Sequence, residues 1–151
     1  LIHASSADTG IMGLILEAPH VFVEEISLNG LKDAKKAFEQ GGLKAGLAKH
    51  HREPEMIFRC WNNIWLSPEF LTWNIVSCLS NIQCPALLIQ GETDAYGTLS
   101  QLDTIEKNVS GICEKKILPN IGHSPHRENP KLVLRSIQQF ISKNINAQKT
   151  E

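Results

Sequence analysis

Two short apolar segments constrain the fold of this chain most strongly. They cover residues 13–18 and 85–90, and proline or glycine follows each of them. Such runs are typical of strands that are buried on both faces, as in a parallel sheet. Residues 113–118 form a weaker third candidate strand, which Pro119 ends. Residues 98–109 and 130–145 instead place their apolar side chains on one helical face. Strands that alternate with helices predict an α/β fold with a mostly parallel sheet and flanking helices.

The long segment between the first two predicted strands has a different character. From residue 27 to residue 80 the sequence contains no convincing strand, and short helical patterns follow one another, two of them opened by Pro54 and Pro68. All three tryptophans of the chain lie in this segment. We therefore predict three parts, which are core residues 1–26, an inserted helical segment over 27–80, and core residues 81–151.

The composition is that of an ordinary globular protein. Of 151 residues, 42% are hydrophobic and 21% are charged, which is not the composition of a disordered chain. The 15 basic and 16 acidic residues give a net charge of −1, which argues against a nucleic-acid or anionic-membrane partner. No apolar run reaches the length of a membrane span. The sequence has no secretory signal and its cysteines form no C-x-x-C pair, so we expect reduced thiols and a cytoplasmic location.

Polar loops that could carry chemistry follow the second and third predicted strands. The first contains Gly91-Glu92-Thr93-Asp94 and the second contains Gly122-His123. In open α/β sheets, ligands bind beyond the carboxyl ends of the strands. An aspartate followed by a histidine suits the last two members of a nucleophile–acid–base triad, in which the imidazole moves a proton and the carboxylate orients it. Asp94 alone also fits a turn or a helix cap, and His123 alone fits a loop histidine bonded to the backbone. Their order and context favour the catalytic interpretation.

These residues resemble part of a known family. Residues 85–94, followed by residues 118–123 and a final amphipathic helix, resemble the end of an α/β-hydrolase-fold enzyme. Residues 13–19 resemble the strand that follows the helix bearing the nucleophile, and the helical segment resembles the lid inserted after that strand. The resemblance covers the second half of the family's fold. It implies that Asp94 is the triad acid and His123 the triad base, with no metal or organic cofactor.

The sequence departs from the family at the nucleophile. The family places it in a Gly-x-Ser-x-Gly elbow ahead of the first strand seen here, and the sequence contains no such motif. Ser5 and Ser6 lack flanking glycines, and Ser124 directly follows the histidine. Residues 1–7 start without an initiator methionine and read like the helix after the elbow. We therefore expect a C-terminal fragment of a hydrolase, inactive alone, whose parent cleaves an ester-like or related bond.

Several other side chains are candidates for contact with substrate. Trp61 and Trp65 could line a pocket for a small apolar substrate, or simply form the core of the helical segment. His20 follows the first strand and could face a substrate, whereas His126 would lie near the site or orient the histidine loop. His123 and His126 have the spacing of a metal-binding pair, but no further ligand cluster accompanies them, so no metal is expected.

Two interpretations from other classes remain open. The first is a non-catalytic binding module that keeps the pocket under the lid. The second is a structural half that pairs with a separate N-terminal chain or with a second copy of itself. The second predicts an exposed apolar sheet edge and therefore dimerisation or aggregation. For the hydrolase we expect a small-molecule substrate and neither a nucleic-acid nor a membrane partner.

Overall fold

The computed structural model describes residues 1–6 and 10–145, and the chain divides into two compact units. One unit comprises Leu1–Phe22 and Asn74–Glu151, and the other comprises Val23–Trp73. The second unit is shorter than the predicted helical segment 27–80 at its C-terminal end. Among the described residues, no helix is both long enough and apolar enough to cross a membrane.

The first unit is built on a parallel sheet, as predicted. Within the described residues the strand order is β1 (Leu14–Glu17), β2 (Ala86–Gly91) and β3 (Cys113–Leu118), with β2 paired in parallel to both neighbours. Every residue of β2 is buried, because this strand has a partner on each edge and helices on both faces. The carboxyl ends of β2 and β3 therefore lie side by side, and the loops that follow them start from the same edge of the sheet.

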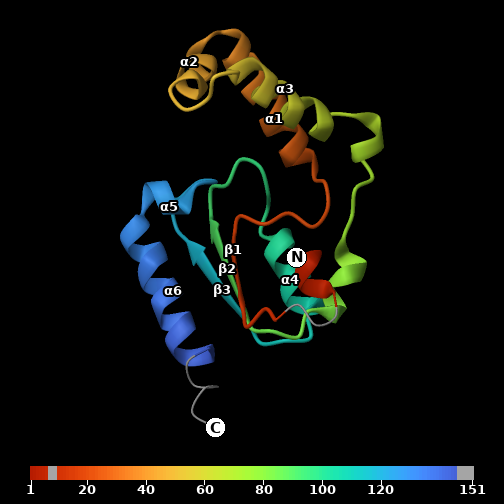
Figure 1. The fold of residues 1–151 in the computed structure, drawn as a ribbon, viewed down its shortest axis with the longest axis vertical. Coiled ribbons are helices and arrows are strands. Elements are labelled where there is room, and N and C mark those ends of the chain that lie inside the picture. The colour runs from red at the N-terminus through yellow and green to blue at the C-terminus, as the bar shows by residue number, and fades with distance from the viewer. Residues whose placement is uncertain (7–9, 146–151) are drawn as a thin grey trace. The chain divides into compact units, whose positions relative to one another are not determined.

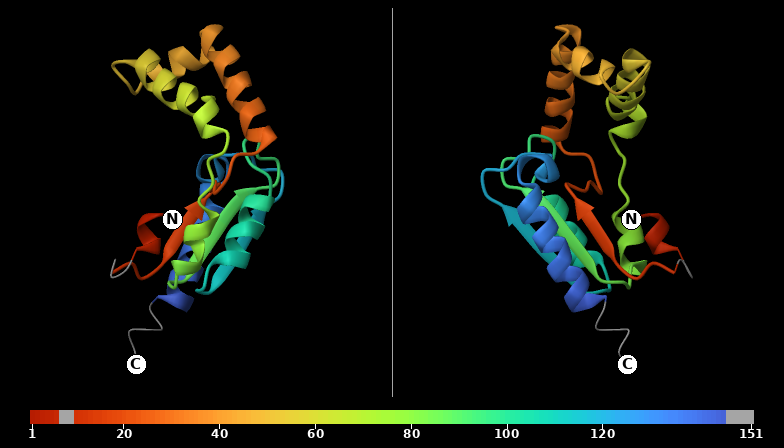
Figure 2. Two further views of the ribbon diagram at one scale, coloured as in Figure 1. Left: turned by 90° about the vertical axis from the view of Figure 1, so that its right-hand side faces the viewer. Right: turned by 60° about the vertical axis from the view of Figure 1, so that its left-hand side comes forward.

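The alternation of side chains along β2 explains how the sheet is covered. Leu88 packs on one face with residues of α4 (Ser100–Asn108), whereas Leu87 and Ile89 pack on the other face with residues of α6 (Pro130–Asn144). Both helices were predicted from their apolar periodicity. Figures 1 and 2 show the sheet between these two helices. The result is a three-layered core that holds the strand ends rigidly in place.

The second unit is helical throughout its regular structure, and its rings form a small core of their own. Phe38 and Phe58 stack with ring centroids 4.1 Å apart, and both side chains are buried. The elements of this unit are, in chain order, α1 (Glu25–Glu39), α2 (Gly42–Ala48), α3 (Pro54–Trp65) and the 3-10 turn η2 (Pro68–Phe70).

Short elements account for most differences from the predictions. The helix expected over residues 1–7 is a single 3-10 turn, η1 (His3–Ser5), because Ser6 already adopts an extended backbone; residue 7 lies outside the described residues. The 3-10 helix η3 (Val76–Asn81), predicted as part of the helical insertion, packs against α4 and η1 in the first unit. The short helix α5 (Pro125–Glu128) was not predicted.

Candidate active site

The acid loop begins where β2 ends. The backbone N–H of Glu92 donates to the carbonyl of Leu118, so the pairing of the two strands continues one residue past Gly91. The chain then turns and brings Asp94 inward, where its side chain is only 1% exposed. Its Oδ1 accepts the backbone N–H of Tyr96 at 2.8 Å. This hydrogen bond within the acid loop helps to orient the carboxylate.

His123 lies opposite this carboxylate. Its Nδ1 lies 2.9 Å from both Oδ1 and Oδ2 of Asp94. An ionised carboxylate only accepts hydrogen bonds, so Nδ1 carries the hydrogen and donates it. The neutral ring then has Nε2 as its acceptor, and the side chain is 38% exposed. This is the geometry of a general base that an acid orients.

Opposing effects set the ionisation of Asp94. Burial by itself raises the pKa of the Asp94 carboxyl, since water is excluded from the charged form. Hydrogen bonds from His123 and from the backbone N–H groups of Tyr96 and Gly97 lower it, and the charge of a protonated His123 adds to them. The sum leaves the pKa of Asp94 below its ordinary value, so the group is an anion at neutral pH.

The two loops are also joined to each other by hydrogen bonds. Thr93 donates both its backbone N–H, at 3.0 Å, and its hydroxyl, at 2.9 Å, to the carbonyl oxygen of Ile121. A Cβ added to Gly91 would collide with the carbonyl oxygens of Ile121 and Gly122. Glycine at position 91 therefore allows the histidine loop to approach the acid loop closely, which gives the Gly91–Asp94 motif a structural reason.

Gln90 supports the acid loop and was missed in the sequence. It is buried at the end of β2, and its Nε2 donates to the carbonyl oxygen of Gly97 at 2.7 Å and lies 3.4 Å from Oδ2 of Asp94. The available signal was a lone amide side chain in an otherwise apolar strand. A buried amide side chain usually forms hydrogen bonds to other polar groups.

Two rings neighbour His123. The ring centroid of Tyr96 lies 4.7 Å away and that of His20 lies 6.0 Å away, both tilted by about 50°. His20 was predicted to contact a substrate; the structure places its ring beside that of His123, and contact with a substrate stays a prediction. Between β1 and His20 the chain passes through Ala18, which directly follows β1 and adopts a left-handed conformation with φ of 44°. Tyr96 was missed, because nothing in its sequence neighbourhood distinguishes it from a turn residue.

His126 contacts a carboxylate from a distant part of the chain. Its Nδ1 lies 2.7 Å from Oε1 of Glu17, and its backbone N–H donates to the same oxygen at 2.8 Å. Glu17 is the last residue of β1, so this contact attaches the histidine loop to a third strand end. Residues 1–6 and 10–145 contain no group of three or more His, Cys, Asp or Glu side chains arranged to hold a metal ion.

Trp61 and Trp65 lie in the Val23–Trp73 unit, whereas Asp94 and His123 lie in the other. Trp61 is 39% exposed and meets Phe58 edge-on, with ring centroids 5.7 Å apart. Trp65 belongs to a different group of rings, formed with Phe70 and Trp73. Contact of either tryptophan with a substrate stays a prediction.

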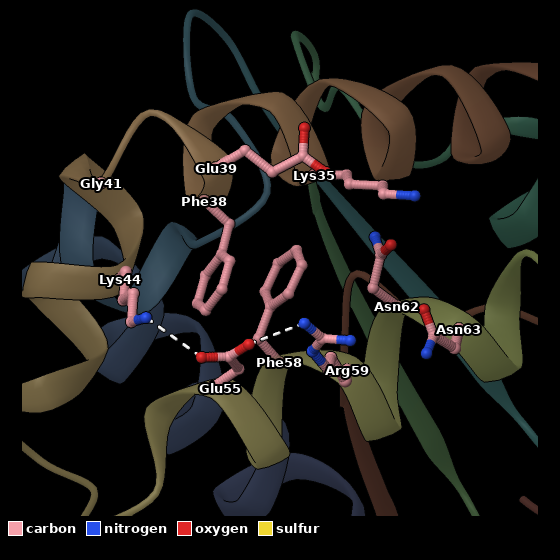
Figure 3. A pocket seen from close by; sticks show the side chains of 10 residues that line it. All are labelled: Lys35, Phe38, Glu39, Gly41, Lys44, Glu55, Phe58, Arg59, Asn62 and Asn63. Atoms are coloured by element: carbon pink, nitrogen blue, oxygen red, sulfur yellow. Dashed lines mark hydrogen bonds and ion pairs between the residues drawn. The ribbon is translucent and has the colours of Figure 1, made fainter.

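The helical unit also contains a cavity of about 370 Å³ between α1, α2 and α3. Figure 3 shows how charged side chains surround it, with Glu55 paired to Lys44 at 3.1 Å and to Arg59 at 2.7 Å. The stacked rings of Phe38 and Phe58 also line it. None of the predicted catalytic residues lines it.

Comparison with known proteins identifies the fold. No family model matches the sequence, and no curated protein matches it. A serine hydrolase involved in carbazole degradation superposes with a TM-score of 0.67 at 15% identity, covering 93% of this chain and 58% of that one. An α/β hydrolase from a deep-sea metagenome of the Medee basin gives a TM-score of 0.56 at 17% identity, covering 90% and 59%. This chain has an α/β-hydrolase fold.

A further structural match supports the same fold. A membrane phospholipase A described as a bacterial virulence factor gives a TM-score of 0.68 at 20% identity, covering 96% of this chain and 55% of that one. The chain thus spans 55–59% of the length of these three structures. The resemblance inferred from the sequence is confirmed at the level of the fold.

Proposed function

We propose that this chain supplies the acid and the base of a hydrolase with a nucleophile–His–Asp triad. In this proposal His123 is the base, Asp94 orients it, and the substrate is a small apolar compound with an ester-like bond. One observation carries the proposal: the Nδ1 atom of His123 lies 2.9 Å from both oxygens of a buried carboxylate, on loops that leave adjacent strands of the sheet.

The chemistry follows from an ionised Asp94 carboxylate and a His123 ring whose Nε2 is free to accept a proton. A nucleophile hydroxyl gives its proton to Nε2 of His123 while its oxygen bonds to the carbonyl carbon of the substrate. The imidazolium then returns that proton to the leaving alkoxide as the carbon–oxygen bond breaks. A water molecule, deprotonated by the same nitrogen, hydrolyses the acyl intermediate. Asp94 remains ionised throughout and stabilises the imidazolium, which its lowered pKa supports.

The nucleophile belongs to another segment of the fold in this proposal. The 151 residues contain no Gly-x-Ser-x-Gly motif, and the chain spans 58–60% of the first structures it matches. We assign this chain to the C-terminal part of the α/β-hydrolase fold. By itself it should give no turnover that depends on His123, because acid and base cannot replace a nucleophile.

An apolar substrate is supported by α3. Its side chains Ile57, Trp61 and Ile64 follow one another at positions i, i+4 and i+7, and all of them are exposed. An exposed apolar helical face in a lid suits contact with hydrocarbon parts of a substrate.

Hydrolysis of a short p-nitrophenyl ester tests the proposal, measured for the 151-residue chain and for the complete product of its gene. We expect turnover only in the complete product, reduced about 10⁴-fold or more by His123→Ala and about 10³–10⁴-fold by Asp94→Asn. Turnover by the 151-residue chain that His123→Ala abolishes would overturn the assignment of the nucleophile. An unchanged rate in the His123→Ala form of the complete product would overturn the function itself.

The missing motif also favours a second candidate, a non-catalytic binding module with the α/β-hydrolase fold. The coding sequence ahead of Leu1 separates the two. A Gly-x-Ser-x-Gly elbow encoded there supports the hydrolase, and its absence from the whole gene supports the binding module.

A further inference from the structure

A carboxylate outside the proposed triad binds the loop of His123 on both sides. Oε2 of Glu128 accepts the backbone N–H of Gly122 at 2.8 Å, and Oε1 accepts the backbone N–H of Ser124 at 3.3 Å. These are the residues directly before and directly after His123. Hydrogen bonds from N–H groups to an ionised acceptor are stronger than those between neutral groups.

The local sequence explains how Glu128 returns to this loop. The carbonyl of Ser124 accepts the N–H groups of Arg127 and Glu128, so α5 makes one turn and directs the Glu128 side chain back toward residues 122–124. A Cβ at Gly122 would lie 3.1 Å from Oε1 of Glu128, closer than an ordinary contact. Glycine at position 122 thus makes room for the carboxylate, as glycine at position 91 makes room for the loop itself.

His123 needs such support because packing alone does not fix it. Its side chain is 38% exposed, and its position on Asp94 depends on the backbone that carries it. A general base works only while its ring stays within hydrogen-bond reach and in the correct tautomer. Two hydrogen bonds that flank residue 123 restrict that backbone at both ends.

From these contacts we infer that Glu128 is a positioning residue for His123. It fixes the backbone on both sides of the ring and so keeps Nδ1 on Asp94. The inference rests on the proposed function only in treating His123 as the base. The hydrogen bonds and their effect on the ring can be measured without any catalysis.

The chain offers graded variants and a matched control. Glu128→Ala removes both acceptors, whereas Glu128→Gln keeps one acceptor oxygen and places an NH₂ group against the second N–H. Gly122→Ala keeps Glu128 but crowds its carboxylate. Arg127→Ala changes the neighbouring residue of the same helix, whose side chain lies outside these contacts, and serves as the control.

The test is NMR on the 151-residue chain at a temperature where every variant is folded. It follows the exchange of the Gly122 and Ser124 amides and the Nδ1–H proton of His123. We expect Glu128→Ala to speed exchange of both amides about tenfold or more and to broaden the Nδ1–H signal. Glu128→Gln and Gly122→Ala should give smaller effects of the same kind. Core amides such as that of Leu88 should keep their exchange rates. Arg127→Ala should leave the exchange of the Gly122 and Ser124 amides and the width of the Nδ1–H signal unchanged.

The inference is overturned if the two amides exchange at the parent rate in the variants, or if they lose protection while the Nδ1–H proton stays sharp. A uniform rise in exchange that includes Leu88 would mean a global effect on stability and would also overturn it. Failure of the proposed function has a different signature. The complete gene product would then be indifferent to His123→Ala, while the NMR effects of Glu128→Ala would persist.

Discussion

Asp94 carries a negative charge where water barely reaches it, and the residues around it explain why. The cost of burial is offset by the ring of His123 and by N–H groups of the following turn, so the pKa of the carboxyl falls below its value in an unfolded chain. A group of this kind stabilises the folded state in its charged form. The charge at the candidate site therefore also contributes to folding.

Stability should depend on pH through this residue. Because the folded pKa of Asp94 is lowered, its contribution is complete above the unfolded value of 3.8 and is lost as the pH falls through the folded value. We expect Asp94→Asn to lower the free energy of unfolding by about 1–3 kcal/mol at pH 6, and by less at pH 3. Urea denaturation at the two pH values measures this.

Asp33→Asn is the control for the pH experiment. Asp33 pairs with Lys36 at 2.9 Å, but both side chains are largely exposed, so the change should be below about 0.5 kcal/mol at either pH. If Asp94→Asn lowered stability equally at pH 3 and pH 6, the charge of Asp94 would have no part in it.

The junction between strand and loop is the element that brings acid and base together. β2 ends at Gly91, and the carbonyl groups of residues 121 and 122 occupy the space that a side chain would need. Backbone atoms cannot move aside as the end of a flexible side chain can. The close approach of the two loops therefore depends on the lack of a side chain at this position.

Replacing glycine by alanine should change the stability in opposite directions at Gly91 and at a position without close neighbours. We expect Gly91→Ala to destabilise the protein by about 2–4 kcal/mol, because the backbone of the histidine loop must shift. Gly46 lies in α2 with open space around its Cα, so Gly46→Ala should stabilise that helix by about 0.5–1 kcal/mol. Thermal and urea unfolding followed by circular dichroism compare the two. A Gly91→Ala variant as stable as the parent would refute the close approach.

The sequence predicted those elements that have a strong repeating pattern. β1 and β2 were found because each is an apolar run between turn residues, β3 was found as a weaker candidate that Pro119 ends, and α6 was found because its apolar side chains recur at helical spacing. The helix α5 was missed because it has only four residues, Pro125 and three polar ones, which are too few to show a period. The contact between Glu17 and His126 joins residues 109 positions apart, and no local pattern reports such a pair.

At the site, the sequence predicted Asp94 and His123 from their order and their place after strands. Gln90, Tyr96 and Glu128 were missed, although Gln90 gave a signal as a lone amide in an apolar strand. The contacts of all three depend on the path of loops in space, which individual turns such as the left-handed residue Asn120 determine. Chemistry that depends on residue type was therefore predictable, and support that depends on turn geometry was not.

At the scale of the whole molecule, the exposed edge of the sheet is the feature most prone to association with other chains. β1 is an edge strand of the described sheet, and Ile15 in its middle is 42% exposed. It borders an apolar groove of about 300 Å³, lined by Ile11, Met12, Gly13, Ile15, Phe140, Ile141 and Ile145. Unpaired edges with apolar side chains tend to associate.

The 151-residue chain should therefore self-associate as its concentration rises. Size-exclusion chromatography with light scattering should show a growing mass, and Ile15→Lys should shift the equilibrium toward monomer by placing a charge at the edge. Leu134→Lys is the control, since Leu134 on α6 is even more exposed than Ile15, at 58%, but does not line the groove. A parent chain that stays monomeric up to high micromolar concentration would contradict this prediction.

The role of His123 as a base depends most on the position of one proton. Nitrogen-15 NMR of the His123 ring in the 151-residue chain reports directly which ring nitrogen carries it in the neutral state. We expect hydrogen on Nδ1 and a free Nε2, and we expect Asp94→Asn to admit the opposite tautomer. Hydrogen on Nε2 of the unmodified chain, with Nδ1 bare, would contradict the assignment of His123 as a base oriented by Asp94.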